Sequence, residues 1–88
     1  MKPKRDSIAG SLESSDVLVT IAPSAETTVD LQVESIVIKQ YGKRIRAVAE
    51  ELVAAAGLSA AKVRIQDRGA LECTLRARME TAIARALA

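Results

Sequence analysis

The sequence predicts a small α+β domain, a two-layer sandwich in which two helices cover one face of a mainly antiparallel sheet of three or four strands. Residues 16–22 form a short, mostly apolar run, and apolar and polar residues alternate over residues 27–34 and again near residue 65. Two other segments repeat apolar residues every three or four positions. The expected order is β-β-(β)-α-β-α, where the bracketed strand is a short additional one ahead of the other two. With 88 residues, the chain is expected to form a single domain over residues 8–88.

The composition limits the classes of function. Hydrophobic residues make up 49% of the chain, yet it has one Tyr and neither Phe nor Trp, so the core is aliphatic. Lys and Arg total 13 against 11 Asp and Glu, which gives a net charge of +2. A nearly balanced charge without aromatic side chains for base stacking argues against nucleic acid as a partner.

Metal binding and self-contained catalysis are not expected, because the chain has no His and a single cysteine, Cys73. Cys73 is expected to be a small core residue rather than a nucleophile. It has no partner for an intramolecular disulfide, and no apolar stretch of the signal-peptide kind follows the N-terminus, which favours a cytoplasmic location. No apolar run approaches the roughly 20 residues of a bilayer span, so a soluble protein without a membrane partner is expected.

The N-terminal part predicts a tail and two strands. Residues 1–7 are basic and offer little to bury, so they are expected to be a flexible tail. Strand signals follow over residues 16–22, where both faces are mostly apolar, and over residues 27–34, where one face is polar. Because only about four residues join these runs, the simplest arrangement is an antiparallel hairpin.

The apolar period changes to that of a helix after Ser35, a candidate N-cap. The helix is expected to run for about five turns and to stop at Gly57, which favours the left-handed conformation found just past helix ends. Its apolar stripe comprises Ile38, Tyr41, Ile45, Val48, Leu52 and Ala55 or Ala56.

The C-terminal part predicts a strand over residues 61–67, a turn at Asp67-Arg68-Gly69 and then a second helix. The segment Gly69–Leu75 is compatible with either a strand or a helix. We favour the helix, because a helical apolar stripe continues to the C-terminus. That stripe comprises Leu71, Leu75, Met79, Ala82 and Ala86, with Ile83 at its edge.

The run from Gly10 to Asp16 places two reachable hydroxyls on a turn beside a strand. A serine needs an adjacent base to act as a nucleophile, so these hydroxyls are instead candidates for a group that another enzyme attaches. Glu13 and Asp16 flank the serines; they either orient the metal or basic groups of a modifying enzyme or keep the turn hydrated. Glu50 and Glu51 are expected on a solvated helix face.

Basic residues on the two helices have two interpretations. They form ordinary solvated faces, or they dock acidic partner proteins and lie near the phosphates of a tethered group. The residues concerned are Lys39, Lys43, Arg44, Arg46, Arg76, Arg78 and Arg85.

Three runs carry a resemblance to a known family. They are G-S-L-E-S-S-D-V-L-V-T-I-A-P, D-L-Q-V-E-S and D-R-G-A-L-E-C-T-L-R-A-R-M-E. In these runs, and over about the whole chain after the tail, the sequence resembles the acyl carrier protein subunit (gamma chain) of bacterial citrate lyase. The family's opening motif usually reads G-T-L-E-S-G-D-V. Its Ser carries a phosphodiester-linked 2'-(5''-phosphoribosyl)-3'-dephospho-CoA.

The resemblance implies that Ser14 is the covalent attachment residue. The family's Gly after the modified Ser is Ser15 here, so Ser15 and then Ser11 remain alternative hydroxyls. As a carrier, the chain is expected to have no catalytic residues, because the prosthetic group brings the thiol. The fold expected for the family differs from the four-helix bundle of fatty-acid-type carriers, whose Asp-Ser-Leu attachment motif is absent from this sequence.

The resemblance also implies partners and a reaction cycle. Acetyl carried on the thiol is exchanged for citryl by the alpha subunit of citrate lyase, and the beta subunit then cleaves citryl to oxaloacetate and regenerates the acetyl thioester. Citrate is thereby cleaved to acetate and oxaloacetate. A prosthetic-group transferase is a further expected partner. The alternatives are the carrier subunit of malonate decarboxylase or of citramalate lyase, or a small α+β binding module without a covalent group.

Overall fold

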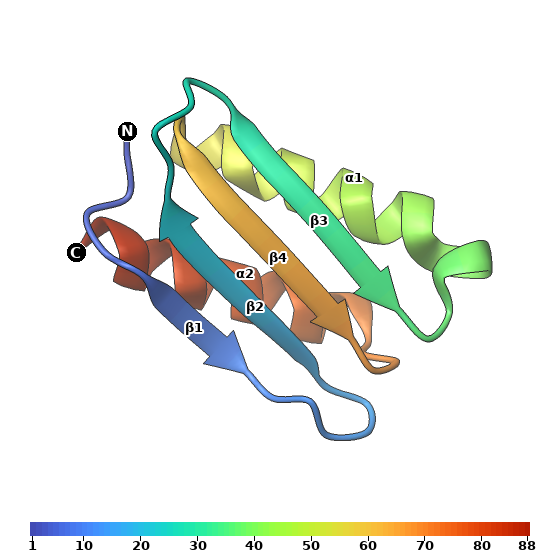
Figure 1. Ribbon diagram of the computed structural model, residues 1–88. Coiled ribbons are helices and arrows are strands. Elements are labelled where there is room, and N and C mark those ends of the chain that lie inside the picture. Colours follow the sequence, from blue (N-terminus) through green and yellow to red (C-terminus); the bar gives the residue numbers. More distant parts are fainter.

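The computed structural model describes residues 1–88 and contains four strands and two helices (Figure 1). The order β-β-β-α-β-α confirms the expected one, with the short additional strand first. The elements are β1 (Ser7–Gly10), β2 (Val17–Pro23), β3 (Val29–Ser35), α1 (Ile38–Ala56), β4 (Ala61–Asp67) and α2 (Glu72–Leu87).

The strands form one sheet in the order β1-β2-β4-β3, in which β2 pairs antiparallel with both β1 and β4. The hairpin expected between β2 and β3 is wrong, because β4 lies between them and pairs in parallel with β3. The physical reason is the connection through α1. A strand, a helix and a second strand form a crossover unit, which returns the chain parallel to its starting strand.

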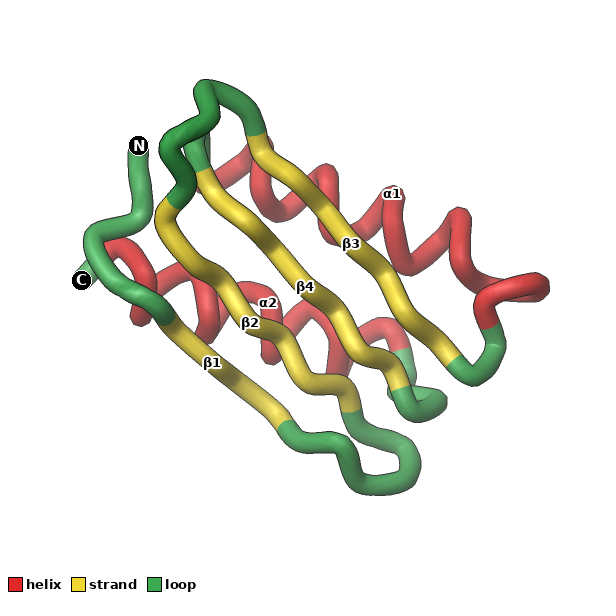
Figure 2. Tube along the Cα trace, viewed as in Figure 1, coloured by secondary structure: helices red, strands yellow, loops and turns green.

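Both helices lie on one face of the sheet, which confirms the two-layer α+β sandwich and excludes a helical bundle (Figure 2). The core between the layers is aliphatic, and Ile21, Ile65 and Met79 are its largest fully buried side chains. On β4 the outward residues Lys62 and Arg64 are exposed. The sheet therefore has one buried and one solvated face, as the alternating pattern predicted.

Helix α1 ends as expected at Gly57, which adopts φ 68° and donates its backbone N–H to Ala54 O. Its start differs from the expectation, because Val37 rather than Ser35 occupies the N-cap position. The Ser35 hydroxyl accepts a hydrogen bond from Val37 N at 3.0 Å. Of the expected stripe, Ile45 and Val48 are buried, while Leu52 and Ala56 are partly buried and Ala55 is exposed. The buried face also includes Ala49 and Val53, which were not in the expected stripe.

The first turn of α1 extends beyond the end of β3 in Figure 1, so it has no sheet to pack against. Ile38 and Tyr41, the first two residues of the expected stripe, are accordingly exposed. Periodicity identifies the side of a helix that can be buried, but the length of the neighbouring sheet decides how much of it is buried.

The segment Gly69–Leu75, compatible with strand or helix in the sequence, contains the beginning of α2 at Glu72. Leu75 opens the buried stripe, whereas Leu71 is exposed at the N-cap. The expectation that Cys73 lies in the core is wrong, because its side chain is exposed. Two residues along a helix correspond to about 200°, so Cys73 faces away from the side that Leu75 buries.

Asp67 joins three elements at one end of the sheet. Its side chain is only 4% exposed. It accepts hydrogen bonds from the Ser35 hydroxyl at 2.8 Å and from Ala70 N at 3.0 Å. These bonds hold the ends of β3 and β4 and the segment that enters α2, and they compensate the burial of a polar group.

The N-terminal residues contact the rest of the domain. Ser7 belongs to β1, one residue before the expected boundary at residue 8, because its buried hydroxyl donates to Ala82 O of α2 at 2.7 Å. Lys4 N donates to Ala86 O at 2.7 Å, and the Met1 amino group donates to Gly57 O. Mobility of residues 1–7 stays a prediction. Neither helix is long and apolar enough to cross a membrane.

Candidate functional site

The candidate site is the connection between β1 and β2, residues 11–16, which we call the serine turn. Its two ends are joined by a hydrogen bond from Ser11 N to Val17 O at 3.2 Å. Gly10 precedes it with φ 90°, and a Cβ at this position would overlap the Val17 carbonyl oxygen. Glycine is therefore required for the chain to leave β1 and return so closely beside β2.

Ser15 gives the turn its shape. Asp16 N donates to Glu13 O at 3.1 Å, and Ser15 has φ 66°, as a type II turn over residues 13–16 requires at its third position. Ser15 N donates to Arg68 O at 2.8 Å, while Arg68 N donates to Asp16 O at 2.9 Å. Two residues of one strand thus oppose a single residue of the other, which is the arrangement of a G1 bulge. Such a bulge favours Gly at this position, so Ser15 holds a left-handed backbone that serine disfavours.

Asp16 anchors the serine turn to α2. Its carboxylate accepts hydrogen bonds from Arg78 Nε and Nη2, both at 3.2 Å, from the Ser11 hydroxyl at 2.8 Å and from Val17 N at 2.7 Å. These donors, the Arg78 guanidinium first, lower the pKa of Asp16 to about 2. The turn is therefore tied to the helix by a charge-assisted contact across 62 positions of sequence.

A pH dependence of stability follows. The Asp16 pKa in the folded protein lies below the ordinary value of 3.8, so folding favours the carboxylate. The resulting stabilisation is complete above about pH 4 and is lost as the pH falls toward 2. We expect the stability advantage of the wild-type protein over Asp16→Asn to be larger at pH 6 than at pH 2.5. Urea unfolding at both values measures it.

Asp30→Asn is the matched control for this experiment, because Asp30 is exposed on β3 and makes no ion pair. The stability difference between wild type and Asp30→Asn is expected to be nearly the same at both pH values. An equal difference at both pH values for Asp16→Asn as well would contradict the proposed anchoring by the carboxylate.

The three candidate hydroxyls differ in their surroundings. Ser11 is half-buried, and its hydroxyl donates to Asp16 and accepts from Glu13 N at 3.2 Å. Ser15 is exposed, but its backbone is committed to the bulge. Ser14 is exposed at the second position of the turn, and its hydroxyl makes no hydrogen bond within the chain. Of the three, Ser14 combines a free hydroxyl with an unstrained backbone.

Glu13 and Asp16, which flank the serines in the sequence, have different environments. Asp16 is engaged by Arg78, whereas Glu13 is exposed and its side chain has no ion pair. The two carboxylates therefore do not form a shared site. No group of three or more His, Cys, Asp or Glu side chains is placed to hold a metal ion.

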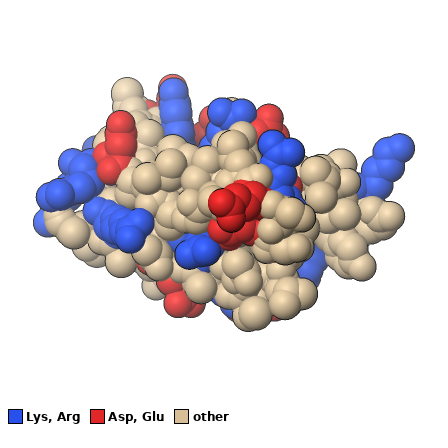
Figure 3. Space-filling model, turned by 90° about the horizontal axis from the view of Figure 1, so that it is seen from below, with Lys and Arg blue, Asp and Glu red and all other residues tan.

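All five arginines on the helices are engaged within the chain. Arg44 and Arg76 both pair with Glu72, Arg76 also pairs with Glu51 at 2.9 Å, and Arg46 pairs with Glu50 at 3.1 Å. Arg85 donates to Ile8 O. Figure 3 shows acidic and basic side chains interspersed on the face in view. The helices thus present mixed charge. Within that set Lys39, Lys43 and Arg85 have no ion pair, and of these only Arg85 makes a hydrogen bond within the chain.

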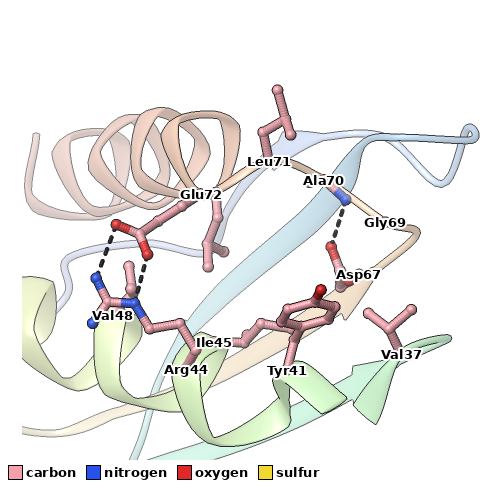
Figure 4. Close-up of a pocket in the computed structure, with 11 residues that line it drawn as sticks. Val37, Tyr41, Arg44, Ile45, Val48, Asp67, Gly69, Ala70, Leu71 and Glu72 are labelled. Carbon is pink, nitrogen blue, oxygen red and sulfur yellow. Dashed lines mark hydrogen bonds and ion pairs between the residues drawn. The ribbon is translucent and has the colours of Figure 1, made fainter. Parts of the chain in front are cut away.

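An apolar groove of about 450 Å³ lies between the N-terminal half of α1 and the start of α2. Figure 4 shows Tyr41 and Arg44 projecting from α1 toward the segment that enters α2, with Arg44 bonded to Glu72. Gly69, Ala70 and Leu71 form the other wall. This segment directly follows Arg68, the residue bonded to the serine turn, so the groove and the turn belong to the same end of the molecule.

Two residues of this region were not predicted from the sequence. Arg78 was considered only as part of a basic face, and Arg68 only as part of a turn. Both act on the serine turn from positions more than 50 residues away. The period of α2 offered one signal for Arg78, because it lies next to the buried Met79 and can reach the edge of the sheet. No local pattern indicates that Arg68 opposes Ser15.

The fold and the serine turn define a small α+β platform that presents two exposed hydroxyls without a hydrogen bond, those of Ser14 and Ser15, beside the start of β2. The chain belongs to the family of citrate lyase acyl carrier proteins. The family model described as "Malonate decarboxylase delta subunit (MdcD)" matches residues 4–86.

Several relatives are similar over nearly the whole chain. The citrate lyase acyl carrier protein of Klebsiella pneumoniae is 48% identical over 86 residues, which are 98% of this chain and 89% of the relative. Its counterpart in Escherichia fergusonii is 50% identical over 82 residues, covering 93% and 84%. That of Streptococcus mutans is 49% identical over 86 residues, covering 98% and 84%.

A solved structure has the same fold. A chain in the crystal structure of a Pseudomonas malonate decarboxylase hetero-tetramer in complex with malonate superimposes with a TM-score of 0.82. The match covers 96% of this chain and 86% of the other, at 23% identity.

Proposed function

We propose that this chain is the acyl carrier subunit of citrate lyase. It carries acetyl and citryl thioesters on 2'-(5''-phosphoribosyl)-3'-dephospho-CoA, attached through a phosphodiester to Ser14. The observation that carries the proposal is a sequence identity of about 50%, over nearly the full length of the chain, to proteins named citrate lyase acyl carrier protein. The free, exposed hydroxyl of Ser14 supports the attachment residue.

The residues of the serine turn fit a bulky covalent group. A modifying enzyme has to reach the Ser14 oxygen without unfolding the carrier. The Ser14 hydroxyl meets this requirement, because it is exposed and its esterification disrupts no hydrogen bond within the chain. Gly10, the bulge at Ser15 and the Asp16–Arg78 pair hold the turn in place. The prosthetic group supplies the thiol that holds the acyl group.

The chain itself is proposed to be non-catalytic and to work in the cytoplasm. Its partners are the alpha and beta subunits of citrate lyase and the transferase that attaches the prosthetic group. A covalently held substrate reaches successive active sites at high effective concentration, so the carrier needs a stable platform and a fixed attachment point rather than reactive side chains. Purified alone, the polypeptide is expected to show no lyase activity.

A second candidate is the carrier subunit of malonate decarboxylase. It is supported by the family model and by the shared fold with a chain of the Pseudomonas hetero-tetramer. The two functions differ in the enzyme that accepts the carrier. Reconstitution with citrate lyase alpha and beta subunits is expected to give citrate cleavage, and activity only with malonate decarboxylase subunits would favour the second candidate.

Mass spectrometry tests the attachment. After co-expression with the prosthetic-group transferase, the intact protein is expected to gain the mass of one phosphoribosyl-dephospho-CoA. Trypsin should release residues 6–39 as one peptide, since no Lys or Arg lies between Arg5 and Lys39. Fragmentation of this peptide is expected to place the group on Ser14. An unmodified peptide from an active lyase complex would contradict the proposal.

A further inference from the structure

Arg68 is fixed beside the serine turn by its backbone. It follows the last residue of β4, donates its N–H to Asp16 O at 2.9 Å and accepts the N–H of Ser15 at 2.8 Å. Ser15 is the immediate neighbour of Ser14 in the chain. The two backbone hydrogen bonds therefore keep the Cα of Arg68 close to Ser14 as long as the bulge is intact.

Arg68 is also the one arginine whose guanidinium is free. The chain has eight arginines. Arg44, Arg46, Arg64, Arg76 and Arg78 are in ion pairs, and Arg5 and Arg85 donate to backbone carbonyl oxygens. Arg68 is exposed and makes neither kind of contact through its side chain. An unpaired guanidinium beside the proposed attachment site can bind the attached phosphate, because its planar N–H groups donate two parallel hydrogen bonds to phosphate oxygens.

Arg68 lines a polar groove of about 310 Å³. The groove lies on the sheet face that the helices leave open, where Arg64 and Gln66 of β4 point outward, and Ser35 lies at its end. Arg64 is held by Glu34 at 2.9 Å. The carboxylates of Glu34 and Asp67 also line the groove, but Arg64 and Ser35 engage them. Arg68 and Gln66 are therefore the polar side chains of the groove without an internal partner, and a guanidinium and an amide suit a ligand made of phosphate and sugar.

We propose that Arg68, together with this groove, binds the phosphodiester at Ser14 and the ribose next to it. The inference rests on the proposed attachment at Ser14. The charges around the serine turn make Arg68 the available counter-ion. Arg78 is neutralised by Asp16, and the exposed Glu13 repels a phosphate. In this arrangement the first phosphate is bound to the folded domain, and the rest of the prosthetic group moves about that bound phosphate.

Phosphoserine installed at position 14 during translation provides a direct probe. The second pKa of a phosphoserine is about 6 and falls when a cation is near. We expect a ³¹P NMR titration to give a pKa roughly half a unit lower in otherwise wild-type protein than in the Arg68→Gln variant. Arg68→Lys, which keeps the charge but loses the fork, is expected to lie between them.

Lys62→Gln is the matched control. It removes one exposed positive charge from the same strand, at the end opposite to Arg68, roughly 20 Å away at the rise of a β-strand. It is expected to leave the pKa of phosphoserine 14 unchanged. The backbone bonds of Arg68 do not involve its side chain, so Arg68→Gln is expected to fold normally, and a circular dichroism melt checks this.

The outcomes separate the two proposals. Identical titration curves for wild type and Arg68→Gln would overturn the phosphate site. An equal shift in Arg68→Gln and Lys62→Gln would also overturn it, because the effect would then be one of net charge. If the transferase loads a hydroxyl other than Ser14, both proposals fail. If the transferase attaches the group to Ser14 but the titration curves of wild type and Arg68→Gln are identical, only the proposed phosphate site at Arg68 is wrong.

Discussion

Ser14→Ala is expected to abolish both attachment of the prosthetic group and citrate cleavage by the reconstituted complex. The thiol that carries the acyl group belongs to the prosthetic group, so a chain without the attachment hydroxyl has no thiol on a flexible arm. The loss should therefore be complete, with activity at background. Intact-mass measurement after co-expression with the transferase, followed by an assay with alpha and beta subunits, measures both effects.

Ser15→Gly is the control for this experiment. It removes the neighbouring hydroxyl and places Gly where φ is 66°, so the bulge is retained and its backbone strain is relieved. Attachment and activity are expected to persist. Loss of attachment in Ser15→Gly with retention in Ser14→Ala would move the attachment to Ser15. Ser11 is a poorer alternative, because its hydroxyl already bonds to Asp16 and Glu13.

Gly10→Ala is expected to cause the largest loss of stability at the serine turn. The new methyl group would overlap the Val17 carbonyl oxygen, and φ 90° is unfavourable for alanine. The left-handed backbone and the overlap together cost about 3 kcal/mol. For a domain of this size, the melting temperature should fall by about 15 °C. A thermal melt followed by circular dichroism measures the change.

Gly57→Ala separates the two causes. Gly57 also has positive φ, at 68°, but a Cβ there would have no atom within 4 Å. Only the backbone term remains, so the cost should be about 1 kcal/mol. Equal losses for Gly10→Ala and Gly57→Ala would show that the close approach of the chain to Val17 is not a constraint on the serine turn.

The elements with a clear period were predictable. β4 occupies residues 61–67 as expected, and α1 ends at Gly57 as expected. The bounds of β4 follow from the turn residues on either side of a short alternating segment, and the end of α1 follows from a Gly after a long amphipathic segment. Local sterics and burial of one face determine both. The serine turn was also visible, since small residues directly precede an apolar strand.

The pairing of the strands was not predictable from the length of a loop. Residues 24–28 join β2 to β3, and a short connection favours a hairpin. The crossover through α1 instead brings β4 back between them, where Val63 and Ile65 are buried against both neighbours. The strand-helix-strand order was a signal for a parallel pair, but only the packed core decides which strands are neighbours.

Burial at the ends of the helices was likewise decided by the assembled fold. Leu71 and Tyr41 belong to apolar stripes, but both are exposed and line the apolar groove. Asp67 shows the reverse: a charged residue expected in a turn is almost fully buried, because Ser35 and Ala70 satisfy its carboxylate.

By itself, the sequence determined the fold class, the two helices, the aliphatic core and the hydroxyl-bearing turn, since each follows from local period, residue size and composition. Only the tertiary structure decided that Arg78 anchors Asp16 and that Arg68 stands opposite Ser15 with a free guanidinium. These partners lie more than 50 residues from the turn, and contacts over such separations form only when the whole core brings distant segments together.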